Sequence, residues 1–196
     1  MIKRLERNLG EPAPIPESAI KRAEEILRGG QLTRYGEFSG TESEVAALER
    51  EFAEYLGARF AIALNSGGNA IYLALLVAGV KPGDEVLMNA FTLAPVPGAV
   101  VNAGAIPVYV ECGDDFMIDI EDFERKASGA AKVLLLSHMR GHIADMQAIV
   151  AICEQHDIKL IEDCAHTLGA SWDGTASGRF GQFGCYSLQA YKHINA

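Results

Sequence analysis

Residues 132–166, KVLLLSHMRGHIADMQAIVAICEQHDIKLIEDCAH, decide the fold. Two short apolar runs, residues 132–137 and 158–162, flank an amphipathic stretch at residues 145–156. Apolar runs of this length are typical of buried strands, and a helical pattern between them indicates a β-α-β unit whose strands run parallel. The sequence therefore predicts a parallel sheet with helices packed against it.

The same alternation continues on both sides of this unit. The other apolar runs predict strands at residues 60–64, 85–90, 106–110 and 183–187. Helical patterns lie between them at residues 69–78, 95–103 and 120–127, and residues 172–174 have the composition of a turn. This order is typical of an α/β domain with three αβα layers and a mainly parallel sheet.

Two helices are expected ahead of this sheet. Pro16 and Glu17 open an amphipathic stretch that Gly29 and Gly30 close. A capping box at residues 41–44 precedes a second helical pattern, for which Gly57 is the stop. We therefore expect residues 1–40 to be a helical arm and loop, and residues 41–196 to be one large ligand-binding domain.

The composition excludes several classes of protein. Of the 196 residues, 49% are hydrophobic and 22% are charged, so the chain can bury a large core and is not expected to be disordered. Its 17 basic and 26 acidic side chains give a formal net charge of −9. This excess of acid argues against non-specific binding of nucleic acid, and an anionic ligand would have to be held by local dipoles.

The sequence carries no signal for secretion, membrane insertion or metal binding. No apolar run follows the charged first ten residues, and no stretch is long and apolar enough to span a membrane. The cysteines lie far apart, without a C-x-x-C pair or a histidine at metal-ligand spacing, at Cys112, Cys153, Cys164 and Cys185. We therefore expect a cytoplasmic protein with reduced thiols and no bound metal.

In such a sheet, ligands bind beyond the carboxyl ends of the strands. The first of these ends is a glycine-containing turn at residues 65–70, which leads into a helix. Glycine lets backbone N–H groups approach a ligand, and the start of a helix favours an anion. Gly67, Gly68 and Asn69 could therefore cradle a phosphate, with an ordinary helix cap as the alternative.

Charged side chains follow two other strands. Asp163 comes directly after residues 158–162, where a buried acid needs a cation or several donors, although aspartate is also a common N-cap. His166 by itself is more typical of a structural histidine. Lys192 follows the last strand and would become nucleophilic if desolvated, whereas most lysines are solvated surface charges.

Together, these three features match the needs of pyridoxal 5'-phosphate. Its phosphate needs backbone N–H groups, its pyridine nitrogen needs a carboxylate that keeps it protonated, and its aldehyde needs a lysine for a Schiff base. Once the amino donor has displaced it, the lysine can carry a proton between carbons. The sequence therefore indicates a site for this cofactor at the turn, Asp163 and Lys192.

Several motifs, taken as a set, are similar to those of one family. They lie at residues 64–70, 81–86, 103–108, 138–146, 161–166 and 186–192. On these motifs the chain resembles the fold-type-I, pyridoxal-phosphate-dependent sugar aminotransferases named for DegT, DnrJ and StrS. The resemblance runs from the loop at residues 32–36 to the final residue, and it implies the large, cofactor-binding domain of that fold.

The resemblance also implies roles for individual residues. Lys192 would form the Schiff base, Asp163 would pair with the pyridine nitrogen, and His166 would lie close to the ring and its hydroxyl. The residues that would hold the phosphate are Gly67, Gly68, Asn69 and Ser187. The implied reaction moves an amino group from glutamate or glutamine to the cofactor and then to a keto-sugar, usually nucleotide-linked. Family members work as homodimers whose sites lie at the subunit interface.

Two local departures from the family pattern concern the cofactor. Gly68 stands where the family usually has threonine, so Asn69 is the expected substitute for the missing hydroxyl. The aromatic residue that stacks on the ring usually follows a threonine, yet Thr92 is followed by Leu93, with Phe91 on the other side. Either the ring therefore lies against Leu93, or the local register is shifted.

The third departure is the end of the chain at Ala196, four residues after Lys192. Family members continue with further large-domain strands and a smaller carboxyl-terminal domain, so the resemblance implies the front part of a longer aminotransferase. A related sugar dehydratase carries histidine where the aminotransferases carry the Schiff-base lysine. Lys192, followed by His193, therefore favours transamination over dehydration, and a non-catalytic cofactor-binding fragment is the other alternative.

Overall fold

The computed structural model describes residues 12, 14–30, 32–34 and 42–194. The chain divides into two compact units, one made of Met1–Ala63 with Leu188–Ala196 and the other of Leu64–Ser187. The second unit contains the sheet and most of the residues that the sequence singles out.

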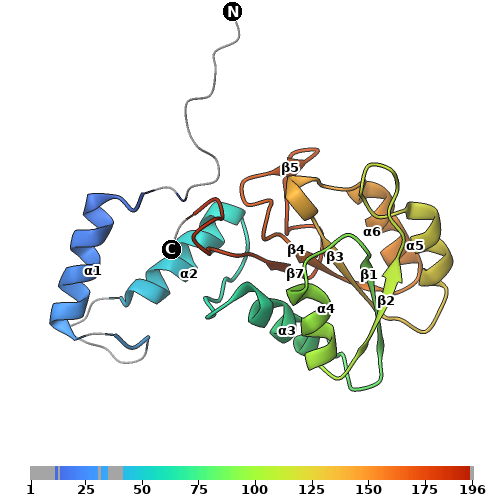
Figure 1. The fold of residues 1–196 in the computed structure, drawn as a ribbon, viewed down its shortest axis with the longest axis horizontal. Helices are drawn as coiled ribbons and strands as arrows, with labels where there is room; N and C mark the ends of the chain where they lie inside the picture. The colour runs from blue at the N-terminus through green and yellow to red at the C-terminus, as the bar shows by residue number, and fades with distance from the viewer. Residues whose placement is uncertain (1–11, 13, 31, 35–41, 195–196) are drawn as a thin grey trace, which may run out of the picture. The chain divides into compact units, whose positions relative to one another are not determined.

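A sheet of five parallel strands forms the centre of the second unit (Figure 1). Its order is β2-β1-β3-β4-β7, and the strands are β1 (Glu85–Asn89), β2 (Ile106–Val110), β3 (Val133–Ser137), β4 (Lys159–Asp163) and β7 (Phe183–Cys185). The first four strands begin and end within one residue of the predicted ranges, whereas β7 ends two residues earlier than predicted. The parallel sheet expected from the sequence is therefore confirmed.

Two pairs of helices cover the two faces of this sheet. The first pair is α3 (Gly67–Val77) and α4 (Pro95–Asn102), and the second is α5 (Ile120–Ala127) and α6 (Met146–Gln155). Because successive strand residues point to opposite faces, Leu135 of β3 packs in the core under α3 and α4 while Leu134 packs in the core under α5 and α6. The predicted three-layer αβα architecture is confirmed.

The register of the sheet sets which residues meet at its carboxyl end. Ser137 at the end of β3 is paired with Asp163 at the end of β4, and Asp163 is paired with Cys185 at the end of β7. Side chains that are 26 residues apart in sequence therefore lie side by side on neighbouring strands.

The strand predicted at residues 60–64 is wrong. No strand pairs with this segment in the described part of the chain, and the side chains of Phe60 and Ile62 are 73% and 72% exposed. Its backbone is held instead by a side chain, because the N–H of Ala63 donates to Glu49 Oε1 at 2.7 Å. Apolar alternation favours a strand, but a strand also needs a neighbour for its backbone hydrogen bonds.

A short hairpin was not predicted from the sequence. It consists of β5 (Ser171–Trp172) and β6 (Thr175–Ala176), which flank the predicted turn. Asp173 and Gly174 have φ angles of 45° and 80°, and positive values at both central residues are typical of a tight two-residue hairpin turn. Strands of two residues are too short to leave an apolar pattern.

The first unit contains the two predicted helices, α1 (Glu17–Gly29) and α2 (Glu44–Leu56). Ser43 caps α2, since its side chain accepts the N–H of Ala46, whereas Thr41 of the predicted capping box lies outside the described residues. Gly30 and Gly57 end the two helices in left-handed conformations, as expected. Within the described ranges, none of the helices has the length and apolar character needed to cross a membrane.

Candidate active site

Asp163 is held by two donors at the carboxyl end of β4. The residue is 9% exposed, and its Oδ2 accepts a hydrogen bond from Ser137 Oγ at 2.7 Å while its Oδ1 accepts one from the N–H of Ala165 at 3.2 Å. Both contacts use the carboxylate as an acceptor. Asp163 is therefore a buried, oriented acceptor at the edge of the sheet where ligands bind.

Glu162 is a second buried acid, which sequence reasoning did not single out. It is 0% exposed, and four donors surround its carboxylate, namely the N–H groups of Gly178, Phe180 and Gly181 at 2.8–2.9 Å and His138 Nε2 at 3.1 Å. Two consecutive acids at a strand end must point to opposite faces, which could have indicated this role. Glu162 ties the segment after β6 to the sheet.

Glu162, His138 and Cys164 also have ligand atoms within 4.8 Å of one another. The donor set does not fit a metal ion, because the oxygens of Glu162 are already used by N–H donors. In addition, burial raises the pKa of the Cys164 thiol well above its usual value, whereas a metal-bound cysteine is a thiolate. The cluster is better described as a hydrogen-bonded anchor.

The start of α3 forms the predicted turn for an anion. Ser66 is the N-cap, and its Oγ accepts the N–H of Asn69 at 3.1 Å. The N–H groups of Gly67 and Gly68 lie in the first turn, where no intrahelical acceptor exists. A Cβ atom added to Gly67 would lie 3.4 Å from the Cβ of Ser187, so the structure brings Ser187 against this turn.

Asn69 is more constrained than the sequence indicated. Its backbone N–H is used by Ser66, and its side-chain Nδ2 donates to Asn65 Oδ1 at 2.7 Å. The second hydrogen of that amide is the donor that Asn69 has left for a phosphate. The backbone of Gly67 and Gly68 therefore provides the better part of the predicted cradle.

His166 lies in the turn after β4 and contacts the loop after β3. Its Nδ1 accepts the N–H of Arg140 at 3.3 Å, so a neutral His166 ring carries its proton on Nε2. Arg140 and Gly141 have φ angles of 58° and 88°, and left-handed backbone at a non-glycine residue is uncommon. The loop thus presents an amide to His166 at the cost of local strain.

The aromatic side chain near the site is turned toward another loop. The rings of Phe91 and Phe116 lie 5.1 Å apart with a 42° angle between their planes, and the N–H of Phe91 donates to Cys112 Sγ at 3.3 Å. Leu93 is 44% exposed and remains available for a ligand. Between them, the buried hydroxyl of Thr92 has no hydrogen-bond partner among the described residues.

Alanine substitutions can distinguish Leu93 from Phe91 as the residue against the cofactor ring. We expect Leu93→Ala to shift the absorption band of bound pyridoxal phosphate and to weaken its binding by about three- to tenfold, because it removes apolar contact area of roughly 40–60 Å². Phe91→Ala, the matched control, should leave the band unchanged. A shift with Phe91→Ala alone would contradict this placement.

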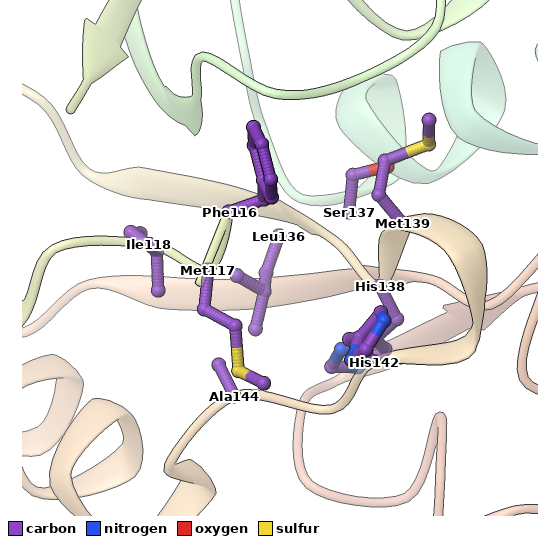
Figure 2. A pocket seen from close by; sticks show the side chains of 9 residues that line it. All are labelled: Phe116, Met117, Ile118, Leu136, Ser137, His138, Met139, His142 and Ala144. Carbon is purple, nitrogen blue, oxygen red and sulfur yellow. The ribbon is translucent and has the colours of Figure 1, made fainter. Parts of the chain in front are cut away.

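A small cavity lies beside Ser137 and His138. It has a volume of about 10 Å³, enough for one water molecule at most. Figure 2 shows His138 and His142 at one side of it and Met117 and Ala144 at the other, with Phe116 near the end of β3. This cavity is too small for a substrate or cofactor, so the candidate site is the open carboxyl edge of the sheet.

The thiols next to Asp163 are not nucleophiles. Burial raises the pKa of Cys185 to about 12, and it raises that of Cys164 well above its usual value. A thiol with such a pKa stays protonated at neutral pH, and the thiol is far less nucleophilic than the thiolate. Both thiols are free and buried.

Lys192 belongs to the first unit, in the segment Leu188–Ala196. It is partly buried, and its backbone N–H donates to the carbonyl oxygen of Gln189 at 2.7 Å. Of the predicted site residues, Gly67 and Ser187 lie against each other. Asp163 and His166 each have the hydrogen-bond partners given above. The role of Lys192 stays a prediction from the sequence.

Comparisons with known proteins identify the family of the chain. A family model described as the DegT/DnrJ/EryC1/StrS aminotransferase family matches residues 14–196. The "Pleiotropic regulatory protein" of Geobacillus stearothermophilus is 38% identical over 153 residues, which make up 78% of this chain and 41% of that relative. The "L-glutamine:2-deoxy-scyllo-inosose aminotransferase" of Streptomyces kanamyceticus is 30% identical over 192 residues, which make up 95% of this chain and 45% of that relative.

The fold is also found among solved structures. The aminotransferase from Psychrobacter cryohalolentis matches with a TM-score of 0.85 and 28% sequence identity, over 93% of this chain and 45% of that one. The chain therefore spans less than half the length of these relatives. Since the family model matches residues 14–196, the chain belongs to the DegT/DnrJ/EryC1/StrS aminotransferase family.

Proposed function

We propose that this chain binds pyridoxal 5'-phosphate at the carboxyl edge of its sheet and serves a transamination. The observation that carries the proposal is Asp163, a buried carboxylate with a donor on each oxygen at the end of a central strand. Burying a carboxylate costs free energy unless a cation or hydrogen-bond donors compensate for the lost water, and buried acids of this kind are common at functional sites. A protonated pyridine nitrogen is a cation of the required kind.

The residues of the site fit this cofactor. The N–H groups of Gly67 and Gly68 at the start of α3, next to Ser187, suit a phosphate, because the start of a helix attracts an anion without a basic side chain. The unsatisfied hydroxyl of Thr92 adds a polar group that a ligand could use. In this proposal Asn69 contacts the phosphate, and His166 and Leu93 lie against the ring. Asp163 accepts a hydrogen bond from the protonated pyridine nitrogen.

Lys192 has the two remaining tasks. It holds the cofactor covalently at rest, and its amine moves a proton between carbon atoms once the amino donor has taken its place. The cofactor itself supplies an electron sink, which weakens the C–H bond next to the amino nitrogen. Asp163 keeps that sink effective, because it stabilises the protonated ring.

We further propose an amino acid as donor and a keto-sugar or keto-cyclitol as acceptor. The name of the Streptomyces kanamyceticus relative, an L-glutamine:2-deoxy-scyllo-inosose aminotransferase, supports glutamine as donor and a cyclic polyhydroxylated ketone as acceptor. A nucleotide-linked keto-sugar is the acceptor class that the resemblance favours. The protein is proposed to work in the cytoplasm as a homodimer with sites at the subunit interface, without nucleic acid or membrane partners.

A regulatory role without turnover is the second candidate. One relative at 38% identity carries the name "Pleiotropic regulatory protein", which supports a regulatory role. Sugar dehydration within the same family is a weaker alternative, because Lys192 stands at the position of the Schiff-base lysine. The two main candidates differ in whether an amino donor converts the bound cofactor.

Borohydride reduction tests the proposal directly. The purified chain is incubated with pyridoxal phosphate, reduced and mapped by mass spectrometry, and we expect one pyridoxyl adduct, at Lys192. Glutamine and glutamate are then added in separate experiments before reduction. If the chain serves a transamination, at least one of these donors should replace Lys192 on the cofactor and so abolish the adduct. An adduct that both donors leave intact would favour the regulatory role, and labelling scattered over surface lysines would contradict the site.

A further inference from the structure

We propose that Ser137 is a positioning residue. It holds the carboxylate of Asp163 in the orientation in which that carboxylate can accept a hydrogen bond from the N–H group of the cofactor ring. This inference rests on the proposed cofactor, and it concerns a residue that neither the motifs nor the comparisons assign. Ser137 need not touch the cofactor. It acts through the oxygen atom that it binds.

The contact between Ser137 and Asp163 is short, buried and fixed by the sheet. The two residues are register partners on β3 and β4, they are 6% and 9% exposed, and Ser137 Oγ donates to Asp163 Oδ2 at 2.7 Å. The N–H of Ala165 holds the other oxygen at 3.2 Å. Two donors from different elements grip the carboxylate, so its rotation about the Cβ–Cγ bond is restricted.

Asn89 in turn fixes the backbone of Ser137. The backbone ladder between β1 and β3 pairs Leu87 with Leu134 and Met88 with Leu135. Beyond it, the buried amide of Asn89 accepts the N–H of Ser137 at 2.8 Å and donates to its carbonyl oxygen at 3.2 Å.

The same amide nitrogen donates to the carbonyl oxygen of Phe91 at 2.9 Å. A side chain thus replaces the strand-to-strand bonds where the ladder ends. The line from Asn89 through Ser137 to Asp163 crosses the ends of three neighbouring strands, and each link is buried. Ser137 is therefore a preorganised donor, because its own backbone cannot move without breaking these bonds.

Preorganisation matters for an acceptor of this kind. A carboxylate that is already oriented loses little freedom when a ring N–H arrives, so more of the hydrogen-bond energy appears as binding. Without Ser137, Oδ2 would be a buried acceptor that lacks its donor, and the carboxylate would turn to seek another. The effect should therefore be specific to ligands that carry a ring nitrogen.

A pair of ligands tests this specificity. Dissociation constants are measured for pyridoxal phosphate and for its analogue in which a C–H group replaces the ring nitrogen, and the ratio of the two gives the preference for nitrogen. We expect Ser137→Ala to reduce this preference about tenfold, the size typical of one hydrogen bond to a charged group. Ser137→Thr keeps the hydroxyl and should restore it. Ser128→Ala, which removes an exposed hydroxyl bonded to the carbonyl oxygen of Arg125, is the matched control and should change neither constant.

Asp163→Asn tests whether Ser137 changes the nitrogen preference through Asp163. If Ser137 acts through Asp163, the double variant Ser137→Ala/Asp163→Asn should have the same nitrogen preference as Asp163→Asn alone. Additive losses, or equal weakening of both ligands by Ser137→Ala, would overturn the positioning role and leave Ser137 as packing. Ser137→Cys, with a thiol of similar size, provides the same comparison if the alanine variant does not fold. A wild-type chain that binds neither ligand would instead refute the cofactor itself, and with it this inference.

Discussion

Replacing Lys192 by alanine is expected to abolish the borohydride-reducible adduct with pyridoxal phosphate while the chain stays folded. Lys192 is the only residue to which the proposal gives a covalent bond, and it also moves the proton during transamination. Loss of a positioned acid–base group typically slows such a step by about 10²–10⁴-fold. Mass spectrometry after reduction measures the first effect, and single-turnover conversion of the cofactor by glutamine measures the second.

The control for this experiment is Lys81→Ala. Lys81 is exposed in a turn of the second unit, so its removal should leave both readouts unchanged. An adduct of unchanged yield in the Lys192→Ala chain would refute the assignment, and peptide mapping of that adduct would identify the lysine that forms it. Circular dichroism of both variants separates loss of the site from loss of the fold.

Replacing Glu162 by glutamine is expected to lower the free energy of unfolding by about 2–4 kcal/mol, because buried N–H donors would lose their acceptor. Its two oxygens accept three backbone N–H groups and face His138 Nε2. Glutamine would place an NH₂ group against one set of these donors. Phe180 and Gly181, or Gly178, would then face a donor instead of an acceptor.

Urea unfolding followed by circular dichroism measures this loss. Glu124→Gln is the matched control, because Glu124 is an exposed residue of α5, and a surface change of this kind should stay within about 0.5 kcal/mol. A loss below about 1 kcal/mol for Glu162→Gln would mean that the network is not a structural anchor. Glu162 would then be a candidate for binding a ligand.

Local sequence patterns were sufficient for most of the sheet. Residues 132–137 and 158–162 are continuous apolar runs with a helical pattern between them, and β3 and β4 lie within one residue of these ranges. Burial on both faces of a parallel strand leaves such a run in the sequence. The segment at residues 60–64 has a similar composition but no strand beside it, and composition alone does not reveal a missing neighbour.

The residues of the candidate site also fall into those that the sequence predicted and those that it did not. Asp163 was found because it comes at the end of a predicted strand, and ligands bind beyond the carboxyl ends of parallel strands. The turn at Gly67 and Gly68 was found from its glycines at the start of a helix, although the strand predicted before it does not form. Ser137 and Asn89 were not found, because a serine or an asparagine at a strand end is ordinary in sequence. Their importance comes from hydrogen bonds to residues 26 and 48 positions away.

The sequence by itself therefore determined the fold class and the family, and it predicts the acid and the lysine that the proposed chemistry needs, since these depend on residue type and on short-range spacing. The tertiary structure alone decided that Glu162 is an anchor, that Phe91 packs on Phe116, and that Asp163 is gripped from two sides. The physical reason is that the register of neighbouring strands, which no local pattern encodes, sets which polar groups lie within hydrogen-bond distance.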